Sequence, residues 1–193
     1  MKFAIFASGT GSNAEVLIRS AQAGELSGEV ALVVSDKPSA PVLAKAEALG
    51  VKAELIRPAA YKNKAAYEQE LVSRLQSEEV DLVVMAGYMR LIGPVLLSAY
   101  EGKIINIHPS LLPAFPGLDA IGQALQANVT VTGVTVHYVD AGMDTGPIIA
   151  QREVALEKDD THEMLAKRIQ AVEHKLYPAV VKQLLNEKLG EES

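Results

Sequence analysis

Residues 104–113 read Ile-Ile-Asn-Ile-His-Pro-Ser-Leu-Leu-Pro, an apolar run that leads directly into polar side chains and a loop bounded by proline. Alternate side chains of a strand share a face, so Asn106 and His108 lie on one face while Ile105 and Ile107 lie on the other. An amide beside an imidazole suits reactions in which a carbonyl carbon becomes tetrahedral. The amide can stabilise the oxyanion, and the imidazole can move protons near neutral pH. The stretch therefore predicts a buried strand with a catalytic site on it.

Similar apolar runs recur along the first half of the chain and predict an α/β fold. Strands are expected at residues 3–7, 29–34, 52–56, 82–86 and 103–107, and helices at residues 14–23, 41–49 and 61–78. The first, fourth and fifth strands are almost continuously apolar, which is typical of strands buried on both faces of a parallel sheet. The alternation predicts a doubly wound, mostly parallel, Rossmann-like sheet.

The pattern changes in the second half of the chain. Two long strand-like runs, 131–138 and 147–156, predict a hairpin at the edge of the sheet, with one strand antiparallel to the rest. A long helix from about residue 161 to residue 188 follows, and Pro178 is expected to break or kink it. Asp119 is expected to cap the start of a shorter helix that ends near residue 127.

Composition limits the class of protein. The chain of 193 residues is long enough for one sizeable core and is predicted to be a single domain, and its 49% apolar content excludes a disordered chain. The absence of cysteine excludes disulfides, thiolate metal sites and a cysteine nucleophile. A net charge of −6 argues against a broad nucleic-acid surface. Neither a membrane-spanning run nor a signal-peptide pattern is present in the sequence, so we expect a cytoplasmic location.

The loop between the two late strands offers a partner for His108. Asp144 is the candidate, because a carboxylate held against an imidazole fixes its tautomer and favours its charged form. Taken singly, Asn106, His108, Asp140 and Asp144 are also typical of strand ends and turns. Glycine and proline fix the backbone on both sides of each polar group, which favours the catalytic interpretation for the whole set.

A glycine-rich loop follows the first strand, where residues 8–13 read Ser-Gly-Thr-Gly-Ser-Asn. Such a loop can hold phosphate with backbone N–H groups and the helix dipole, and Ser12 and Asn13 would add side-chain donors or cap the helix. The loop also satisfies the dinucleotide fingerprint, with Asp36 where a ribose-binding acid is expected. A nicotinamide enzyme is therefore a second interpretation, ranked lower because the second half of the chain carries the Asn106 site. A pure binding module ranks lower still, since it needs no acid–base pair.

With these motifs the chain resembles the folate-dependent formyltransferases over nearly its whole length. Residues 106–113 and Asp144 match the group, whereas residues 8–13 resemble its phosphoribosylglycinamide formyltransferase branch. The resemblance implies transfer of the formyl group of 10-formyltetrahydrofolate to the amine of 5-phosphoribosylglycinamide. The products would be formylglycinamide ribonucleotide and tetrahydrofolate, in de novo purine biosynthesis. It implies no metal, nucleic acid or membrane partner, and a monomer or homodimer.

The resemblance also implies roles for individual residues, with residues 1–100 binding the ribonucleotide and residues 101–193 carrying catalysis and folate binding. The implied catalytic residues are Asn106, His108 and Asp144. The implied ribonucleotide contacts are Gly11, Ser12, Asn13 and Glu173. The implied folate contacts are Lys64, Met89, Arg90, Leu91, Ile92, Asn106, Val139, Asp140, Ala141, Gly142 and Met143. From the sequence alone, Lys64, Arg90 and Glu173 could equally be solvated surface charges.

Some features leave alternatives open. Asp119 stands where many relatives carry histidine, so the role of that side chain is not fixed by the resemblance. We expect His137, His162 and His174 to be structural. A related formyltransferase or a formyl-folate hydrolase is the runner-up within the group. We rank both lower because they would carry an additional domain. The net charge of −6 is also unsuited to binding tRNA.

Overall fold

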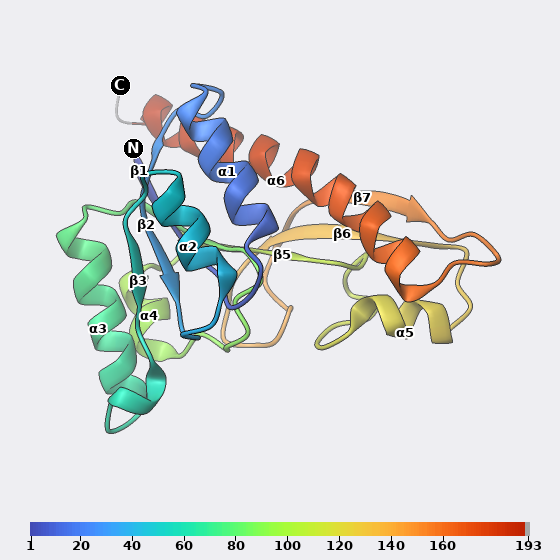
Figure 1. Cartoon of the computed structure of the whole chain (residues 1–193), viewed down its shortest axis with the longest axis horizontal. Helices are drawn as coiled ribbons and strands as arrows, with labels where there is room; N and C mark the ends of the chain where they lie inside the picture. Colours follow the sequence, from blue (N-terminus) through green and yellow to red (C-terminus); the bar gives the residue numbers. More distant parts are fainter. Residues whose placement is uncertain (192–193) are drawn as a thin grey trace.

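The computed structural model describes residues 1–191, with side chains to residue 187, as a twisted sheet covered by helices on both faces (Figure 1). The strands are β1 (Lys2–Phe6), β2 (Glu29–Ser35), β3 (Ala53–Leu55), β4 (Leu82–Met85), β5 (Ile104–His108), β6 (Val131–Tyr138) and β7 (Ile148–Ala155). The helices are α1 (Ser12–Gln22), α2 (Pro41–Ala48), α3 (Lys64–Ser77), α4 (Pro94–Ala99), α5 (Ala120–Gln126) and α6 (His162–Glu191), with a 3₁₀ turn at Pro58–Ala60. The predicted strands are all present, with small shifts at their ends.

The sheet has the order β3-β2-β1-β4-β5-β6-β7, and β1 to β5 run parallel. This confirms the predicted doubly wound fold. The order reverses direction between β1 and β4. In open α/β sheets such a reversal leaves a crevice beyond the carboxyl ends of the strands, and ligands bind there.

The predicted edge hairpin is also confirmed. Strand β6 runs antiparallel to β5 and to β7, so it alone opposes the other strands. The register of β5 and β6 places His137 opposite Asn106 and Thr135 opposite His108. The hairpin thus brings side chains from the second half of the chain onto the strand that carries the motif.

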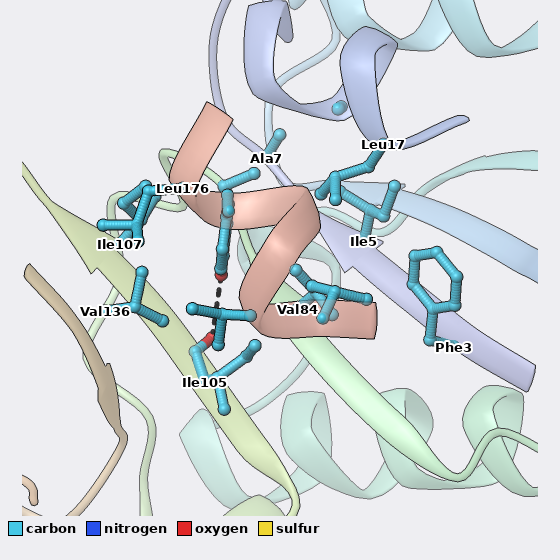
Figure 2. Close-up of a cluster of buried hydrophobic side chains, with 14 of the residues drawn as sticks. Phe3, Ile5, Ala7, Leu17, Val84, Ile105, Ile107, Val136 and Leu176 are labelled. Carbon is cyan, nitrogen blue, oxygen red and sulfur yellow. Dashed lines mark hydrogen bonds between the residues drawn. The ribbon is translucent and has the colours of Figure 1, made fainter. Parts of the chain in front are cut away.

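Side chains alternate between two apolar clusters, one on each face of the sheet. Phe3 and Ile5 of β1 pack beneath α1 and α6 with Leu17, Ile105 and Leu176 (Figure 2). Their neighbours Ala4 and Phe6 face the opposite way, toward α3 and α4. This is the alternation expected for a strand buried on both faces.

Helix α6 crosses the sheet without interruption from His162 to Glu191, so the predicted break at Pro178 is wrong (Figure 1). Proline removes one backbone hydrogen bond from a helix interior. Here Tyr177, Val180 and Val181 are buried on both sides of it, and the Tyr177 hydroxyl donates to the carbonyl oxygen of Met85 at 2.6 Å. Packing against the sheet outweighs the missing bond. No helix in the described range, α6 included, combines the length and apolar character needed to cross a membrane.

Helices α3 and α4 differ most from the sequence prediction, and α1 starts at Ser12 rather than at residue 14. Helix α3 begins at Lys64 rather than at residue 61, because the Asn63 side chain caps it by accepting from the Ala66 N–H at 2.8 Å. Helix α4 was not predicted. Its six residues are too few for a helical period to show, although Pro94 at its first position is a known start signal.

Candidate active site

A cleft with a cavity volume of about 440 Å³ opens at the reversal point of the sheet. Its walls come from the glycine loop, the segment after β4, the end of β5, the start of α5 and the β6–β7 loop. In residue numbers these are 9–13, 85–92, 106–109, 117–121, 137, 139 and 142–144, with His162 and Glu173 from α6. The cleft therefore joins the glycine loop to the segment that begins at Asn106, although the two are far apart in the sequence.

His108 and Asp144 meet inside this cleft, as predicted. His108 Nδ1 lies 3.5 Å from Asp144 Oδ2, and the two side chains are only 8% and 12% exposed. On the other side of the ring, His108 Nε2 lies 2.9 Å from the carbonyl oxygen of Phe115. Both ring nitrogens thus face oxygen atoms, so a ring protonated at both nitrogens can donate to both.

Asp144 is held by two loops. Its backbone is in the left-handed region, with φ 56°, a conformation in which aspartate is enriched among non-glycine residues. The N–H of Gly117 donates to Asp144 Oδ2 at 2.8 Å, so the carboxylate is fixed by the segment before α5 as well as by its own loop. This leaves Oδ2 toward His108, while Oδ1 lies 3.8 Å from His137 Nε2.

His137 is a site residue that sequence reasoning missed. Its Nε2 lies 3.4 Å from Asn106 Nδ2, and its Nδ1 lies 2.8 Å from the carbonyl oxygen of Tyr138. Burial lowers the pKa of His137, although Tyr138 and Asp144 act in the opposite direction. A neutral ring that donates from Nδ1 to Tyr138 presents an acceptor at Nε2, and the amide of Asn106 can donate to it. His137 therefore orients the Asn106 amide.

The glycine loop presents the start of α1 to the cleft. Gly11 has φ 73°, and a Cβ atom there would lie 2.4 Å from Val42 Cγ2, so the turn requires glycine. No side chain caps α1, so the prediction that Ser12 or Asn13 caps this helix is wrong. The Ser12 hydroxyl instead accepts from Gln170 Nε2 at 2.9 Å. An uncapped helix start with backbone N–H groups suits an anion.

Asn13 and Glu173 lie together beside this loop. Asn13 Nδ2 donates to Glu173 Oε2 at 3.2 Å, which joins α1 to α6. Burial raises the pKa of the Glu173 carboxyl, partly offset by the hydrogen bond from Asn13. Asn13 Oδ1 is buried without a hydrogen-bond partner within the described part of the chain. Because a buried unpaired acceptor is costly, the pair is suited to a ligand that brings hydrogen-bond donors.

Most residues predicted to contact folate line the cleft. They are Met89, Arg90, Leu91, Ile92, Asn106, Val139, Gly142 and Met143. Met89, Leu91 and Met143 are exposed apolar side chains that gather in this one cleft, which is typical of a binding site. Arg90 is more than a solvated charge, because its guanidinium carbon lies 5.8 Å from the centre of the Tyr67 ring.

Lys64, Asp140 and Ala141 lie outside the cleft lining. Asp140 turns toward its own loop, where Oδ1 accepts from the Thr145 hydroxyl at 2.6 Å and from the Gly142 N–H at 3.0 Å. The Thr145 hydrogen bond is the main reason that the pKa of Asp140 is lowered. Asp140 thus shapes the wall that carries Met143.

The rim of the cleft carries a contact between an aspartate and a histidine that the sequence did not predict. Asp119 caps α5 as expected, with Oδ1 accepting from the Gly122 N–H at 3.1 Å. The same oxygen lies 2.8 Å from His162 Nε2, and this contact lowers the pKa of Asp119. His162 therefore lies at the site, whereas His174 is outside the lining.

Two further observations concern cofactors. Asp36, the residue that would bind the ribose of a dinucleotide, lies outside the lining and accepts from the Ser8 hydroxyl at 2.6 Å. Among the residues that the structure describes, no three His, Asp or Glu side chains are grouped so that they could hold a metal ion.

Comparisons with known proteins agree with the site. The chain is 55% identical over 184 residues to the phosphoribosylglycinamide formyltransferase of Bacillus subtilis, a match that covers 95% of this chain and 94% of that one. The crystal structure of the Bacillus halodurans phosphoribosylglycinamide formyltransferase superposes with a TM-score of 0.93 at 58% identity, covering 96% of this chain and 95% of that one. The glycinamide ribonucleotide transformylase 1 of Symbiobacterium toebii gives a TM-score of 0.95 at 44% identity, covering 97% and 88%.

A human relative is much longer. The human trifunctional purine biosynthetic protein adenosine-3 is 39% identical over 180 residues, which are 93% of this chain and 18% of that protein. The formyl transferase family itself matches residues 1–181. Both the motifs and their arrangement in the cleft are thus accounted for by one assignment: the chain belongs to the formyl transferase family.

Proposed function

We propose that this chain is a phosphoribosylglycinamide formyltransferase of purine biosynthesis, which transfers the formyl group of 10-formyltetrahydrofolate to the amine of 5-phosphoribosylglycinamide. One observation carries the proposal. A single cleft joins an amide, an imidazole and a carboxylate to an uncapped helix start behind a glycine loop. A substrate anchored by its phosphate at residues 11–13 can reach Asn106 and His108 with its other end. Relatives that match nearly the whole chain carry the same name.

In the proposed step, the amine nitrogen attacks the formyl carbon and a new carbon–nitrogen bond forms. The formyl oxygen becomes an oxyanion, and the Asn106 amide donates to it. Collapse of the intermediate breaks the bond to the folate N10, and the proton lost by the amine reaches that nitrogen. No covalent enzyme intermediate is required.

His108 and Asp144 would move this proton. Their 3.5 Å separation is longer than an ordinary hydrogen bond, so the pair can exchange protons through a bridging water as well as directly. His108 Nε2 stays against the Phe115 carbonyl oxygen, so the proton on Nδ1, at the looser 3.5 Å contact with Asp144, is the one that His108 would donate toward the oxyanion, while Asp144 would accept from the attacking amine. Orientation of Asn106 by His137 keeps the amide donor in place throughout.

The two ligands would divide the cleft. The ribonucleotide places its phosphate against Gly11, Ser12 and Asn13, and its ribose hydroxyls donate to Glu173 and Asn13 Oδ1. The folate ring lies between the segment of Met89 to Ile92 and the loop of Val139 to Met143. Lys64 and Ala141 lie outside the lining, so their contact with folate stays a prediction, as do a cytoplasmic location and a monomeric or homodimeric state.

The test offers 5-phosphoribosylglycinamide with two donors in separate reactions, 10-formyltetrahydrofolate and formate plus ATP. We expect formylglycinamide ribonucleotide only with the folate donor. Formylation from formate and ATP, or no formylation of this acceptor, would contradict the proposal. Binding of NAD would favour the dinucleotide interpretation instead, which the hydrogen bond between Asp36 and Ser8 disfavours.

A further inference from the structure

Ser8 is the first residue of the glycine loop that follows β1, and it contacts the segment that follows β4. Its backbone N–H donates to the carbonyl oxygen of Gly87 at 3.0 Å. Its hydroxyl oxygen accepts from the N–H of Met89 at 2.9 Å. The side chain is buried, with the residue only 6% exposed. One residue therefore holds the folate-side segment by both its main chain and its side chain.

Asp36 fixes the direction of this hydrogen-bond chain. The Ser8 hydroxyl has one proton, which it donates to Asp36 Oδ1 at 2.6 Å, so its oxygen is free to accept from Met89. A hydrogen bond to a carboxylate is stronger than a neutral one. Asp36 follows β2, so the chain of bonds crosses the ends of three adjacent strands.

The far end of the same segment has a separate anchor. The Glu68 carboxylate of α3 accepts from the N–H groups of Gly93 and Leu96, where α4 begins. Glu68 is 2% exposed, so this end is fixed independently of the ribonucleotide side. Between the anchors, residues 86–93 form neither helix nor strand, and Met89 has a side chain 59% exposed at the cleft. The Ser8 contacts thus tie the segment to the glycine loop.

We propose that Ser8, oriented by Asp36, is a positioning residue that couples ribonucleotide binding at residues 9–13 to folate binding at residues 87–92. The inference rests on the proposed function. A phosphate held by the glycine loop favours the loop arrangement in which Ser8 accepts from Met89, and folate binds against that same segment, so both ligands stabilise one arrangement. Because coupling between two ligands is reciprocal, folate strengthens ribonucleotide binding by the same factor.

The experiment measures the dissociation constant of tetrahydrofolate with and without saturating 5-phosphoribosylglycinamide, by calorimetry. Tetrahydrofolate carries no formyl group, so no turnover occurs. In the wild-type protein we expect the ribonucleotide to tighten tetrahydrofolate binding by about fivefold or more, a usual size for coupled sites. In Ser8→Ala the factor should fall to about one while both ligands still bind, since the variant removes the acceptor for Met89.

Ser35→Ala is the matched control. Ser35 is also buried at the end of a strand, but its hydroxyl hydrogen-bonds with the backbone of Lys37 and lies outside the cleft lining. It should keep the coupling factor. Asp36→Asn retains an acceptor for the Ser8 hydroxyl and should keep most of the factor, whereas Asp36→Ala should lose it and serves if Ser8→Ala does not fold.

The possible results distinguish failure of this inference from failure of the proposed function. A wild-type factor near one, or a factor that survives in Ser8→Ala and Asp36→Ala, would overturn the inference, because direct contact between the ligands would then explain any coupling. Loss of the factor in Ser35→Ala would also overturn it. Failure of the wild-type protein to bind tetrahydrofolate would instead overturn the proposed function.

Discussion

Asn106 is central at the residue scale, because its amide lies between buried His137 and the open cleft. We expect Asn106→Ala to cost roughly 3 kcal/mol of transition-state stabilisation, seen mainly in kcat, as for an ordinary oxyanion donor. His137→Phe keeps a buried ring but removes the acceptor at Nε2, and it should lower kcat by about tenfold through loss of orientation. In the Asn106→Ala background, His137→Phe should cost nothing more. Independent, multiplicative losses would show that His137 acts by another route.

His108 and Asp144 make a second prediction at this scale. We expect His108→Ala and Asp144→Asn each to reduce kcat by orders of magnitude with little change in folate affinity, since both act mainly on the transition state. The double variant should lose far less than the product of the single losses if they handle one proton together. Near-normal turnover in either single variant would remove that residue from the mechanism.

At the scale of elements, the approach of α1 to α2 depends on Gly11. Gly11→Ala should destabilise the fold and weaken ribonucleotide binding, because its φ of 73° and the 2.4 Å approach to Val42 Cγ2 both oppose a Cβ atom. Val42→Gly in the same chain should recover part of the lost ribonucleotide binding, because it removes both the Cγ2 atom and the Cβ atom, which would lie at 2.4 and 2.6 Å. Gly24→Ala is the control for conformation alone, since φ is 74° there and the space is open. Equal losses at Gly11 and Gly24 would show that crowding against Val42 is unimportant.

Helix α6 carries a group that is suited to binding more than to stability. Burial raises the pKa of Glu173 above its ordinary value of 4.5, so the folded protein favours the protonated carboxyl. The stability that the protonated Glu173 carboxyl contributes is fully present below pH 4.5 and is lost as the pH rises through the pKa of Glu173 in the folded protein. Glu173→Gln, which cannot ionise, should therefore raise the melting temperature of the ligand-free protein at pH 7, with a smaller gain near pH 4.5.

Ribonucleotide affinity should fall in the same variant, because a carboxylate accepts more strongly from ribose hydroxyls than an amide does. Glu163→Gln is the matched control on the same helix, since its side chain is 78% exposed and pairs with Lys167 at the surface. Differential scanning calorimetry across this pH range measures the effect. A lower melting temperature for Glu173→Gln at pH 7 would contradict the argument.

Across the whole molecule, buried His137 and half-buried His174 are expected to weaken the fold in acid. Burial lowers the pKa values of His137 and His174 below the ordinary 6.5, so the folded protein favours their neutral forms. This stability is present above pH 6.5 and is lost as the pH falls through the folded pKa values. We expect the urea midpoint to decrease from pH 7.5 to pH 5.5, and His174→Gln to flatten that dependence. An unchanged slope in the variant would assign the effect to other groups.

The features that were predictable from the sequence are those set by neighbours in the chain. Asn106 and His108 share a face because successive side chains of a strand point to opposite faces. The glycine loop was predictable because its glycine residues lie together in the sequence. His137 was missed, because its position depends on which residue of β6 pairs with Asn106, and the length of the connection between strands does not fix that register. From the sequence, Asp36 was a candidate for binding the ribose of a dinucleotide. In the structure it lies beside Ser8 instead, because β1 and β2 are neighbours in the sheet. The continuity of α6 through Pro178 could likewise not be predicted, because it depends on the burial of Tyr177.

The hydrogen bond between Asn13 and Glu173 joins residues 160 positions apart. During synthesis, the glycine loop leaves the ribosome long before the residue that completes the ribose site. A nascent chain that ends before α6 therefore has the motif but lacks the carboxylate and the buried face of Leu176 and Tyr177 that holds α6 on the sheet. Ribonucleotide binding should consequently appear only once α6 has been synthesised, in one step with closure of the core.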